Sequence, residues 1–254
     1  MRASLEDVCG CFPTGRHYPG IAELIARTVG DVAGLSAHLA ASEPWAAQKL
    51  AVIDFETTGL SAEQDRVIEV GVACFELGEL TALKNWMCNP GIPIPEEARA
   101  IHNISDEDLA SAPMFAQVMS ELEALIRDHL PVAYNAPFDR GFLQAELARA
   151  RRAVAGMGAS SAPAFDSEVT WVDPLVWVRE LHKDERGYRL TDVCGRLGIA
   201  LETAHRAASD AEASGRVLMA LAPRMPATYG ELIRLQSQYA ARQDVDLAIN
   251  FRRG

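Results

Sequence analysis

The chain has 254 residues, of which 49% are hydrophobic and 23% are charged, a composition that excludes collagen-like and disordered proteins and is typical of a folded globular chain. The formal net charge of −11 at pH 7 argues against a protein that coats long nucleic acids through bulk electrostatics, but it does not exclude a nuclease. The longest apolar runs are far shorter than the roughly 20 residues that cross a bilayer, and the start of the chain lacks a signal-peptide pattern, so we expect a soluble cytoplasmic protein without a membrane partner.

The first part of the chain changes its pattern once, near Lys49. Residues 1–48 predict a helical extension, because apolar residues recur there at helical spacing, with Leu35 and Leu39 on a second short segment. Residues 50–56 are then a short run of branched apolar residues closed by Thr-Thr-Gly, which is typical of a buried strand. Residues 66–76 and 79–88 follow with a Leu-Gly break between them, the pattern of a hairpin.

The middle and end of the chain alternate between strand and helix patterns. A proline-punctuated loop covers residues 90–95, Ser105 begins a short capped helix, and residues 131–135 form a fourth strand. Helical apolar stripes are expected at residues 114–129, 137–150, 174–181, 190–197, 207–221 and 229–241. This order indicates a mixed α/β sheet covered by helices. We expect three parts: a helical extension at 1–48, the main domain at 49–221, and a C-terminal helix and tail at 222–254.

Two carboxylates, Asp54 and Glu56, lie two residues apart on the first predicted strand, so both side chains leave the same face. An ionised pair in an apolar strand is unfavourable unless a positive group compensates it, and a divalent metal would do so. The alternative is that one caps the turn after the strand while the other is solvated at the strand end. On this pair alone the alternative is favoured.

Two further clusters change that balance. Asp139 lies in the first turn of a helix directly after a strand, and His205 precedes Asp210 by five residues at the start of another helix. Each is ordinary by itself, but together with the first pair they supply four carboxylates and one imidazole at the ends of elements of one predicted sheet. Oxygen ligands without cysteine favour Mg²⁺ or Mn²⁺, two such ions can clamp a phosphodiester displacement, and histidine suits proton removal from water near neutral pH.

Three ordered segments carry a family resemblance. Residues 52–60 (VIDFETTGL), 132–143 (VAYNAPFDRGFL) and 205–213 (HRAASDAEA) resemble the three exonuclease motifs of the DnaQ-like DEDDh 3′-to-5′ exonucleases. The resemblance covers residues 49–221. It implies an α/β fold of RNase H-like type, with a mixed five-stranded sheet flanked by helices, and an enzyme that releases nucleoside 5′-monophosphates from 3′ ends.

The resemblance also implies roles for individual residues. Asp54, Glu56, Asp139 and Asp210 match the ligands of two divalent ions, Mg²⁺ or Mn²⁺, and His205 matches the general base; these five are the expected catalytic residues. The expected substrate-binding residues lie in the three motifs and in a segment, residues 101–104, that is similar to the His-Gly-Ile segment near the terminal sugar. They are Phe55, Thr57, Thr58, Gly59, Leu60, His102, Asn135 and Phe138.

Parts of these assignments stay open. A surface histidine in a loop is the alternative for His102. Tyr134 stands where histidine is common in the epsilon-type pattern, and Asn103 stands where glycine is common, which leaves sugar and base preference open. The expected substrates are single-stranded or frayed 3′ ends of DNA, with RNA also open. A DNA polymerase or sliding clamp is a candidate partner for the tail, and a non-catalytic adaptor is the alternative to an enzyme.

Overall fold

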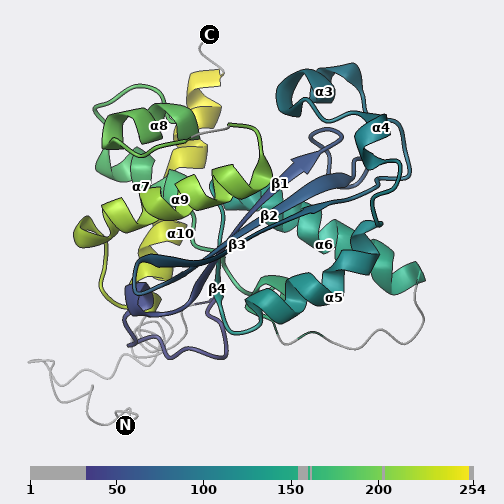
Figure 1. Ribbon diagram of the computed structural model, residues 1–254. Helices are drawn as coiled ribbons and strands as arrows, with labels where there is room; N and C mark the ends of the chain where they lie inside the picture. Colours follow the sequence, from purple (N-terminus) through teal and green to yellow (C-terminus); the bar gives the residue numbers. More distant parts are fainter. Residues whose placement is uncertain (1–32, 154–159, 161, 202–203, 252–254) are drawn as a thin grey trace, which may run out of the picture. The chain divides into compact units, whose positions relative to one another are not determined.

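The computed structural model describes residues 33–153, 160, 162–201 and 204–251 (Figure 1). Residues 34–254 group as one compact unit, and its regular elements begin with a 3₁₀-helix ahead of the first strand. In chain order they are η1 (Trp45–Ala47), β1 (Leu50–Thr57), β2 (Val67–Glu76), β3 (Glu79–Met87), α3 (Glu96–His102), α4 (Asp106–Leu109), α5 (Phe115–Ile126), β4 (Leu130–Val132), α6 (Ala136–Ala153), η2 (Pro163–Phe165), α7 (Pro174–Leu181), α8 (Leu190–Leu197), α9 (Ala207–Leu221), η3 (Ala222–Arg224) and α10 (Tyr229–Phe251).

The sheet has the strand order β3-β2-β1-β4, in which β4 runs parallel to β1 and the other pairs are antiparallel. The mixed α/β class is as expected, but the expected five strands are four among the described residues. At the fifth position only an isolated parallel bridge joins Val132 to Val172. The pairing stops there because Asp173 already caps α7 and Pro174, which has no N–H, occupies the first turn of that helix.

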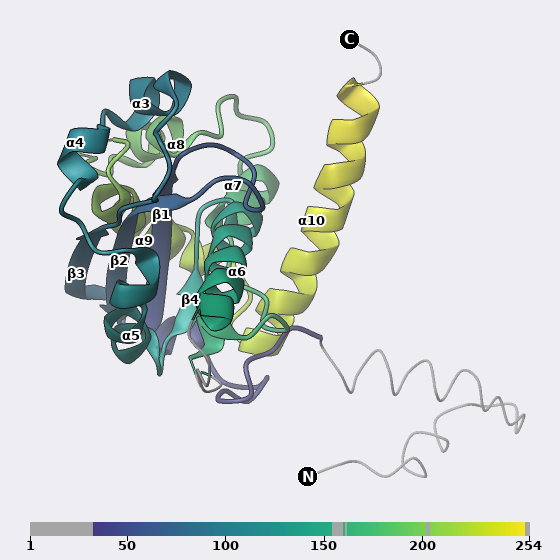
Figure 2. The same ribbon diagram turned by 90° about the vertical axis from the view of Figure 1, so that its right-hand side faces the viewer.

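The sheet lies between two layers of helices (Figures 1 and 2). Helix α9 crosses one face and contacts β1, β2 and β3, whereas α5 and α6 cover the other face. Strand β1 alternates between the two layers. Ala51, Ile53 and Phe55 join the apolar cluster with α5 and α6, so Asp54 and Glu56 point to the face that carries α9.

One helix was not foreseen from the sequence. Helix α3 begins after Pro95 with two glutamates in its first turn, and it is capped at its C-terminal end by Asn103, whose φ of 55° is left-handed. Its last residue, His102, is only 4% exposed. The alternative of a surface histidine in a loop is therefore wrong for this position.

The segment before β1 contains no α-helix in its described part. Residues 1–32 of the expected helical extension lie outside the described residues, and residues 33–48 form turns and η1. Trp45 is buried, and its Nε1–H donates to the carbonyl of Pro226 at 2.6 Å. Pro44 forms an antiparallel bridge with Thr228, so this segment packs against the start of α10. Within the described parts of the chain, no helix combines the length and apolarity that a membrane span requires.

Candidate active site

The site forms where β1 ends beneath the start of α9. Asp54 pairs in register with Gly71 of β2, and a Cβ atom on Gly71 would lie 2.0 Å from the backbone carbonyl carbon of Ala207. Only glycine allows this close approach. The absence of a side chain at Gly71 therefore lets the first turn of α9 rest against the strand next to the β1 carboxylates.

The segment before α9 brings a histidine and an aspartate to the same point. His205 has a left-handed φ of 63°, and its backbone N–H donates to Asp210 Oδ2 at 3.0 Å. Among the described residues, one ligand atom each of Glu56, His205 and Asp210 lies within 4.8 Å of the others. Glu56, which is distant in sequence from His205 and Asp210, can thus reach the same cation as they do.

Asp139 reaches the site from the opposite side of the sheet end. It lies in the first turn of α6, is 3% exposed, and its Oδ1 accepts a hydrogen bond of 3.0 Å from the backbone N–H of Phe55. Asn135 precedes the helix with a left-handed φ of 69°, a conformation that asparagine tolerates better than most residues. The turn between β4 and α6 therefore sets Asp139 directly beside β1.

Burial, with a smaller contribution from neighbouring carboxylates, raises the pKa values of all four site acids. Burial, followed by the charges of Asp139, Asp210 and Glu56, holds the pKa of Asp54 well above its usual range. Burial and neighbouring carboxylates raise the pKa of Glu56 to about 8. Burial also raises the pKa values of Asp139 and Asp210, although backbone hydrogen bonds oppose it.

The cluster therefore needs positive charge. Asp210 Oδ1 is buried and has no hydrogen-bond partner among the described residues. Hard oxygen donors, mutual repulsion and an unpartnered buried oxygen together fit a bound divalent cation. The residues present are thus suited to the metal that the sequence suggested.

A fifth acid, which is fully buried, lies beside the site and was missed from the sequence. Glu69 is 0% exposed and stands opposite Glu56 in the β1–β2 register. Arg206 Nη2 pairs with Glu69 Oε1 at 2.7 Å, and the backbone N–H of Ala207 donates to Glu69 Oε2 at 3.2 Å. This pair ties the start of α9 to β2. The available signal was a single acid within the apolar run of β2.

The residues expected to bind substrate divide into two groups. Leu60 is 86% exposed at the end of the turn after β1, where the Thr57 hydroxyl donates to the carbonyl of Gly59 at 2.6 Å and the Thr58 hydroxyl donates to Asp65 at 3.2 Å. The side chain of Phe55 instead packs in the core, with its ring edge-on to Phe115.

The side chain of Phe138 also packs toward the core. Its ring lies 4.9 Å from that of Phe142 between ring centroids, and it packs against the same apolar cluster as Phe55. Asn135, in contrast, is exposed and lines a cavity described below. Of the two, only Asn135 has a side chain beside open space that a substrate could occupy.

His102 lies near His205 at the other side of the site. Its Nδ1 accepts a hydrogen bond of 3.0 Å from the backbone N–H of Ile104, and its buried Nε2 has no partner among the described residues. Burial, together with the neighbouring His205, lowers the pKa of His102. The neutral ring therefore has one nitrogen left for another group.

A cavity of about 570 Å³ extends from the carboxylates between α7, α8 and the start of α9. His205 and Asp210 line one part of it, and Arg179 and Arg189 line another. Neither arginine side chain forms an ion pair or a hydrogen bond with any residue that the structure describes. The Tyr134 hydroxyl donates to the carbonyl of Tyr188 at 2.6 Å and so joins the turn after β4 to the loop before α8.

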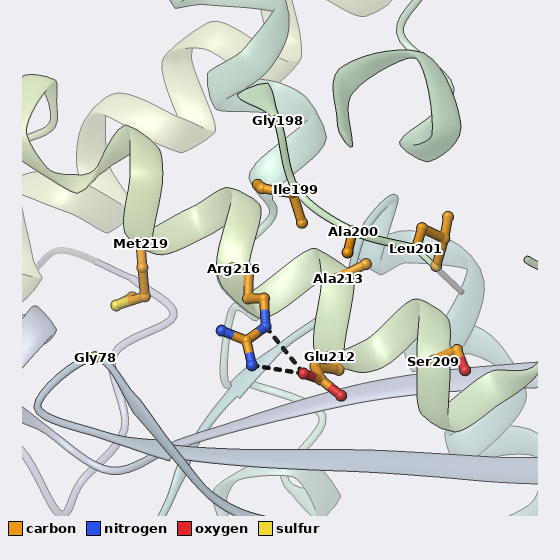
Figure 3. A pocket seen from close by; sticks show the side chains of 10 residues that line it. All are labelled: Gly78, Gly198, Ile199, Ala200, Leu201, Ser209, Glu212, Ala213, Arg216 and Met219. Atoms are coloured by element: carbon orange, nitrogen blue, oxygen red, sulfur yellow. Dashed lines mark hydrogen bonds and ion pairs between the residues drawn. The ribbon is translucent and has the colours of Figure 1, made fainter. Parts of the chain in front are cut away.

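A second cavity, of about 590 Å³, lies along α9 (Figure 3). Arg216 and Glu212 form an ion pair of 2.6 Å in its wall, and Ile199 and Met219 add apolar surface. None of the residues expected to be catalytic lines it. The first cavity is therefore the one that belongs to the candidate site.

Comparison with known proteins agrees with this arrangement. The sequence model of a family described as exonuclease matches residues 51–218. The chain is 33% identical over 167 residues to the PolC-type DNA polymerase III of Streptococcus suis, which is 66% of this chain but only 11% of that protein. It is 32% identical over 180 residues to the epsilon subunit of DNA polymerase III of Treponema pallidum, 70% of this chain and 76% of that one.

Solved structures share the fold. Exonuclease X in complex with 5′ overhanging duplex DNA matches with a TM-score of 0.55 and 21% identity, over 74% of this chain and 99% of that one. The nuclease domain of 3′hExo, a DEDDh family member bound to rAMP, matches with a TM-score of 0.57 and 16% identity, over 70% of this chain and 93% of that one. The expected RNase H-like fold is thus confirmed, with the strand count corrected above.

Proposed function

The chain belongs to the DnaQ-like DEDDh family of 3′-to-5′ exonucleases, and from this premise we propose that it hydrolyses phosphodiester bonds at the 3′ end of DNA to release nucleoside 5′-monophosphates. The observation that supports this most is the convergence of Asp54, Glu56, Asp139 and Asp210. Their pKa values are raised, and no arginine in the described part of the chain donates a hydrogen bond to them. We assign the activity to residues 49–221.

The family implies divalent metal ions, and we propose two of them, Mg²⁺ or Mn²⁺. Asp54, Glu56, Asp139 and Asp210 would hold them. When bound, two such ions supply charge stabilisation for the attacking and the leaving oxygen of an in-line displacement. In this assignment Asp210 offers its unpartnered Oδ1, while its Oδ2 stays on the backbone of His205.

His205 is proposed to take the proton from the attacking water. It is exposed, and its ring forms no hydrogen bond with a described residue, so it is open to a water molecule. Its position is fixed by its backbone rather than by its ring, because its N–H is bound to Asp210. His102, with a neutral ring and a free Nε2, is proposed to contact the terminal sugar.

The substrate strand is proposed to lie between the turn at residues 57–60 and the cavity that Arg179, Arg189 and His205 line. Leu60, which is 86% exposed, would pack against the terminal base. Arg179 and Arg189 would bind backbone phosphates, since arginine recognises phosphate through charge-assisted hydrogen bonds. This local positive wall reconciles a nucleic-acid substrate with the net charge of −11.

DNA is the proposed polymer because the relatives are DNA polymerase III proteins and one structural neighbour is a complex with duplex DNA. The matched region spans about a tenth of the length of the PolC-type relatives. Proofreading with a DNA polymerase or sliding clamp, or a stand-alone repair role, is therefore proposed from likeness alone.

Digestion of a 5′-labelled oligonucleotide tests the proposal. We expect a ladder that shortens from the 3′ end with Mg²⁺, no ladder with EDTA, and mononucleotides carrying a 5′-phosphate. His205→Ala should slow the reaction by about 10²- to 10⁴-fold, the usual contribution of a general base. His182→Ala is the matched control, because His182 pairs with Glu185 outside the site. Full activity of His205→Ala, or an inert natural chain on both DNA and RNA, would contradict the proposal.

A further inference from the structure

Helix α10 lies beyond the residues that the exonuclease family matches, yet it buries an amide side chain, Gln236, together with its apolar ones. Gln236 is 4% exposed, and its Oε1 accepts hydrogen bonds from the backbone N–H of Asp173 at 2.9 Å and from Trp177 Nε1 at 3.2 Å. Its Nε2 donates to the carbonyl of Trp171 at 2.8 Å. These partners fix the orientation of the amide, because two donors require the oxygen and one carbonyl requires the nitrogen.

Asp173, the residue that Gln236 holds, joins the starts of two helices. Its side chain is 4% exposed and accepts hydrogen bonds from the backbone N–H groups of Asn135 and Ala136, both at 3.0 Å, and of Leu175 at 2.9 Å. It forms no ion pair with any residue that the structure describes. Its geometry therefore depends on these hydrogen bonds and on Gln236.

The groups that Asp173 binds carry the metal ligand of α6. Asn135 has the left-handed φ of 69°, and its N–H and that of Ala136 meet the two oxygens of Asp173. Asp139 follows one turn later and contacts the backbone N–H of Phe55. A continuous chain of buried hydrogen bonds thus runs from α10 through Asp173 to the helix start that carries Asp139.

The base of α10 is anchored without Gln236. Tyr229 is 0% exposed, its hydroxyl accepts a hydrogen bond of 3.0 Å from the N–H of Ser36, and its own N–H donates to the carbonyl of Glu43 at 2.9 Å. A substitution of Gln236 therefore removes one connection to Asp173 and leaves the helix attached.

We propose that Gln236 is a positioning residue for the metal ligand Asp139, so that α10 is a working part of the nuclease rather than an appendage. The inference rests on the proposed function. Hydrogen-bonding partners behind metal ligands typically contribute about 10- to 100-fold to metal affinity or activity. Because Gln236 acts through Asp173 and the start of α6, we place its effect at the lower end of that range.

The experiment compares Gln236→Leu with Gln238→Leu in the full chain. Both replace a glutamine of the same helix, but Gln238 is exposed. Mn²⁺ binding to the protein alone is measured by calorimetry, and the Mg²⁺ activation curve and the KM for a DNA oligonucleotide are measured in parallel. For Gln236→Leu we expect about tenfold weaker Mn²⁺ binding and a matching shift in Mg²⁺ activation, with KM for DNA unchanged. Gln238→Leu should match the natural chain.

A double substitution tests the route. If Gln236 acts through Asp173, then Gln236→Leu and Asp173→Asn together should weaken Mn²⁺ binding no more than the stronger single change, because coupled sites are not additive. If Gln236→Leu does not fold, Gln236→Met, which keeps the length of the side chain, takes its place.

Two results overturn the inference. One is a Gln236 variant that binds Mn²⁺ like the natural chain and is only less stable, and the other is full additivity with Asp173→Asn. A natural chain that neither binds Mn²⁺ nor shortens DNA would instead refute the proposed function, so the two failures are distinguishable.

Discussion

Two sets of buried or half-buried acids in this molecule differ in how their charge is compensated. Glu146 is 2% exposed and lies between Arg66, at 2.7 Å, and Arg149, at 3.0 Å; Glu69 is 0% exposed and pairs with Arg206 at 2.7 Å. The four carboxylates at the end of β1 have no ion pair of this kind with a described residue. Arginine neutralises Glu146 and Glu69, and three backbone N–H groups satisfy Asp173. The four site carboxylates instead lie close together without an arginine partner among the described residues, and so mark the place where a cation is required.

Removing an acid should therefore have opposite consequences in the two sets. The largest effect is expected for Asp54→Asn, which should lower the rate of 3′ shortening by about 10³-fold. Charge stabilisation by the metal is worth several kcal/mol, and about 1.36 kcal/mol corresponds to one factor of ten in rate. The folded protein should not suffer, because the change removes mutual repulsion. Rates are measured on a labelled oligonucleotide, and urea unfolding without metal checks that stability is unchanged or higher.

Glu146→Gln should show the reverse pattern. The change leaves the guanidinium groups of Arg66 and Arg149 without their carboxylate, and breaking a buried pair costs about 3–5 kcal/mol. We expect about 3 kcal/mol here, because both arginine side chains are 20% exposed and keep part of their hydration. Urea unfolding measures the loss. A variant as stable as the natural chain would remove the contrast between the two sets.

The effect of Mg²⁺ on the stability of the protein should depend on pH, because protons and the metal compete for the four site carboxylates. The pKa values of the four site carboxylates are raised in the folded state, that of Glu56 to about 8. Because these carboxylates hold their protons more tightly in the folded than in the unfolded state, protonation stabilises the fold. This stabilisation is fully present below about pH 4, and it is lost as the pH rises through the raised pKa values of the folded state. At about 100 times its Kd, bound Mg²⁺ should contribute about 2.7 kcal/mol. Thermal unfolding should therefore show a larger Tm increase on adding Mg²⁺ at pH 8 than at pH 5.5, and equal increases at both pH values would contradict the prediction.

The smallest effect is expected in the arginine wall of the cavity. Arg179→Ala should raise KM for single-stranded DNA with kcat nearly unchanged, and should reduce the slope of log KM against log salt by about 0.7, the value for one phosphate contact on a single strand. Arg186→Ala is the control, since Arg186 is exposed and does not line the cavity. The same salt slope in both variants would exclude Arg179 from phosphate binding.

Local sequence patterns predicted most of the helices and strands, but not the features that depend on tertiary packing. The strands β1 to β4 and the long helices follow from apolar periodicity, which each segment carries within itself. Helix α3 was missed because it is short and proline-flanked, with few apolar residues. The fifth strand was lost because pairing at Val172 is limited by the cap of α7, a constraint that the resemblance did not include.

The motifs predicted which segments form the site, but not which face of the sheet each of their side chains points to. The convergence of Asp54, Glu56, Asp139 and Asp210 followed from three segments with one family pattern, and their electrostatic coupling agrees with it. Phe55 was expected to bind substrate because it lies in the first motif, but alternation along the strand turns its side chain to the other face. The sequence around Arg179 and Arg189 contains no pattern that predicts a role in the site, because their proposed role depends on the cavity that they line in the folded chain.

The bridge between Pro44 and Thr228 has an architectural consequence. It brings the polypeptide leading into β1 alongside the polypeptide leading out of α9, and the hydrogen bond from Tyr229 N–H to the carbonyl of Glu43 closes the same junction. A module whose entrance and exit are neighbours can be spliced into the middle of a longer polypeptide without stretching either flank. This geometry suits a nuclease whose relatives include enzymes many times its length.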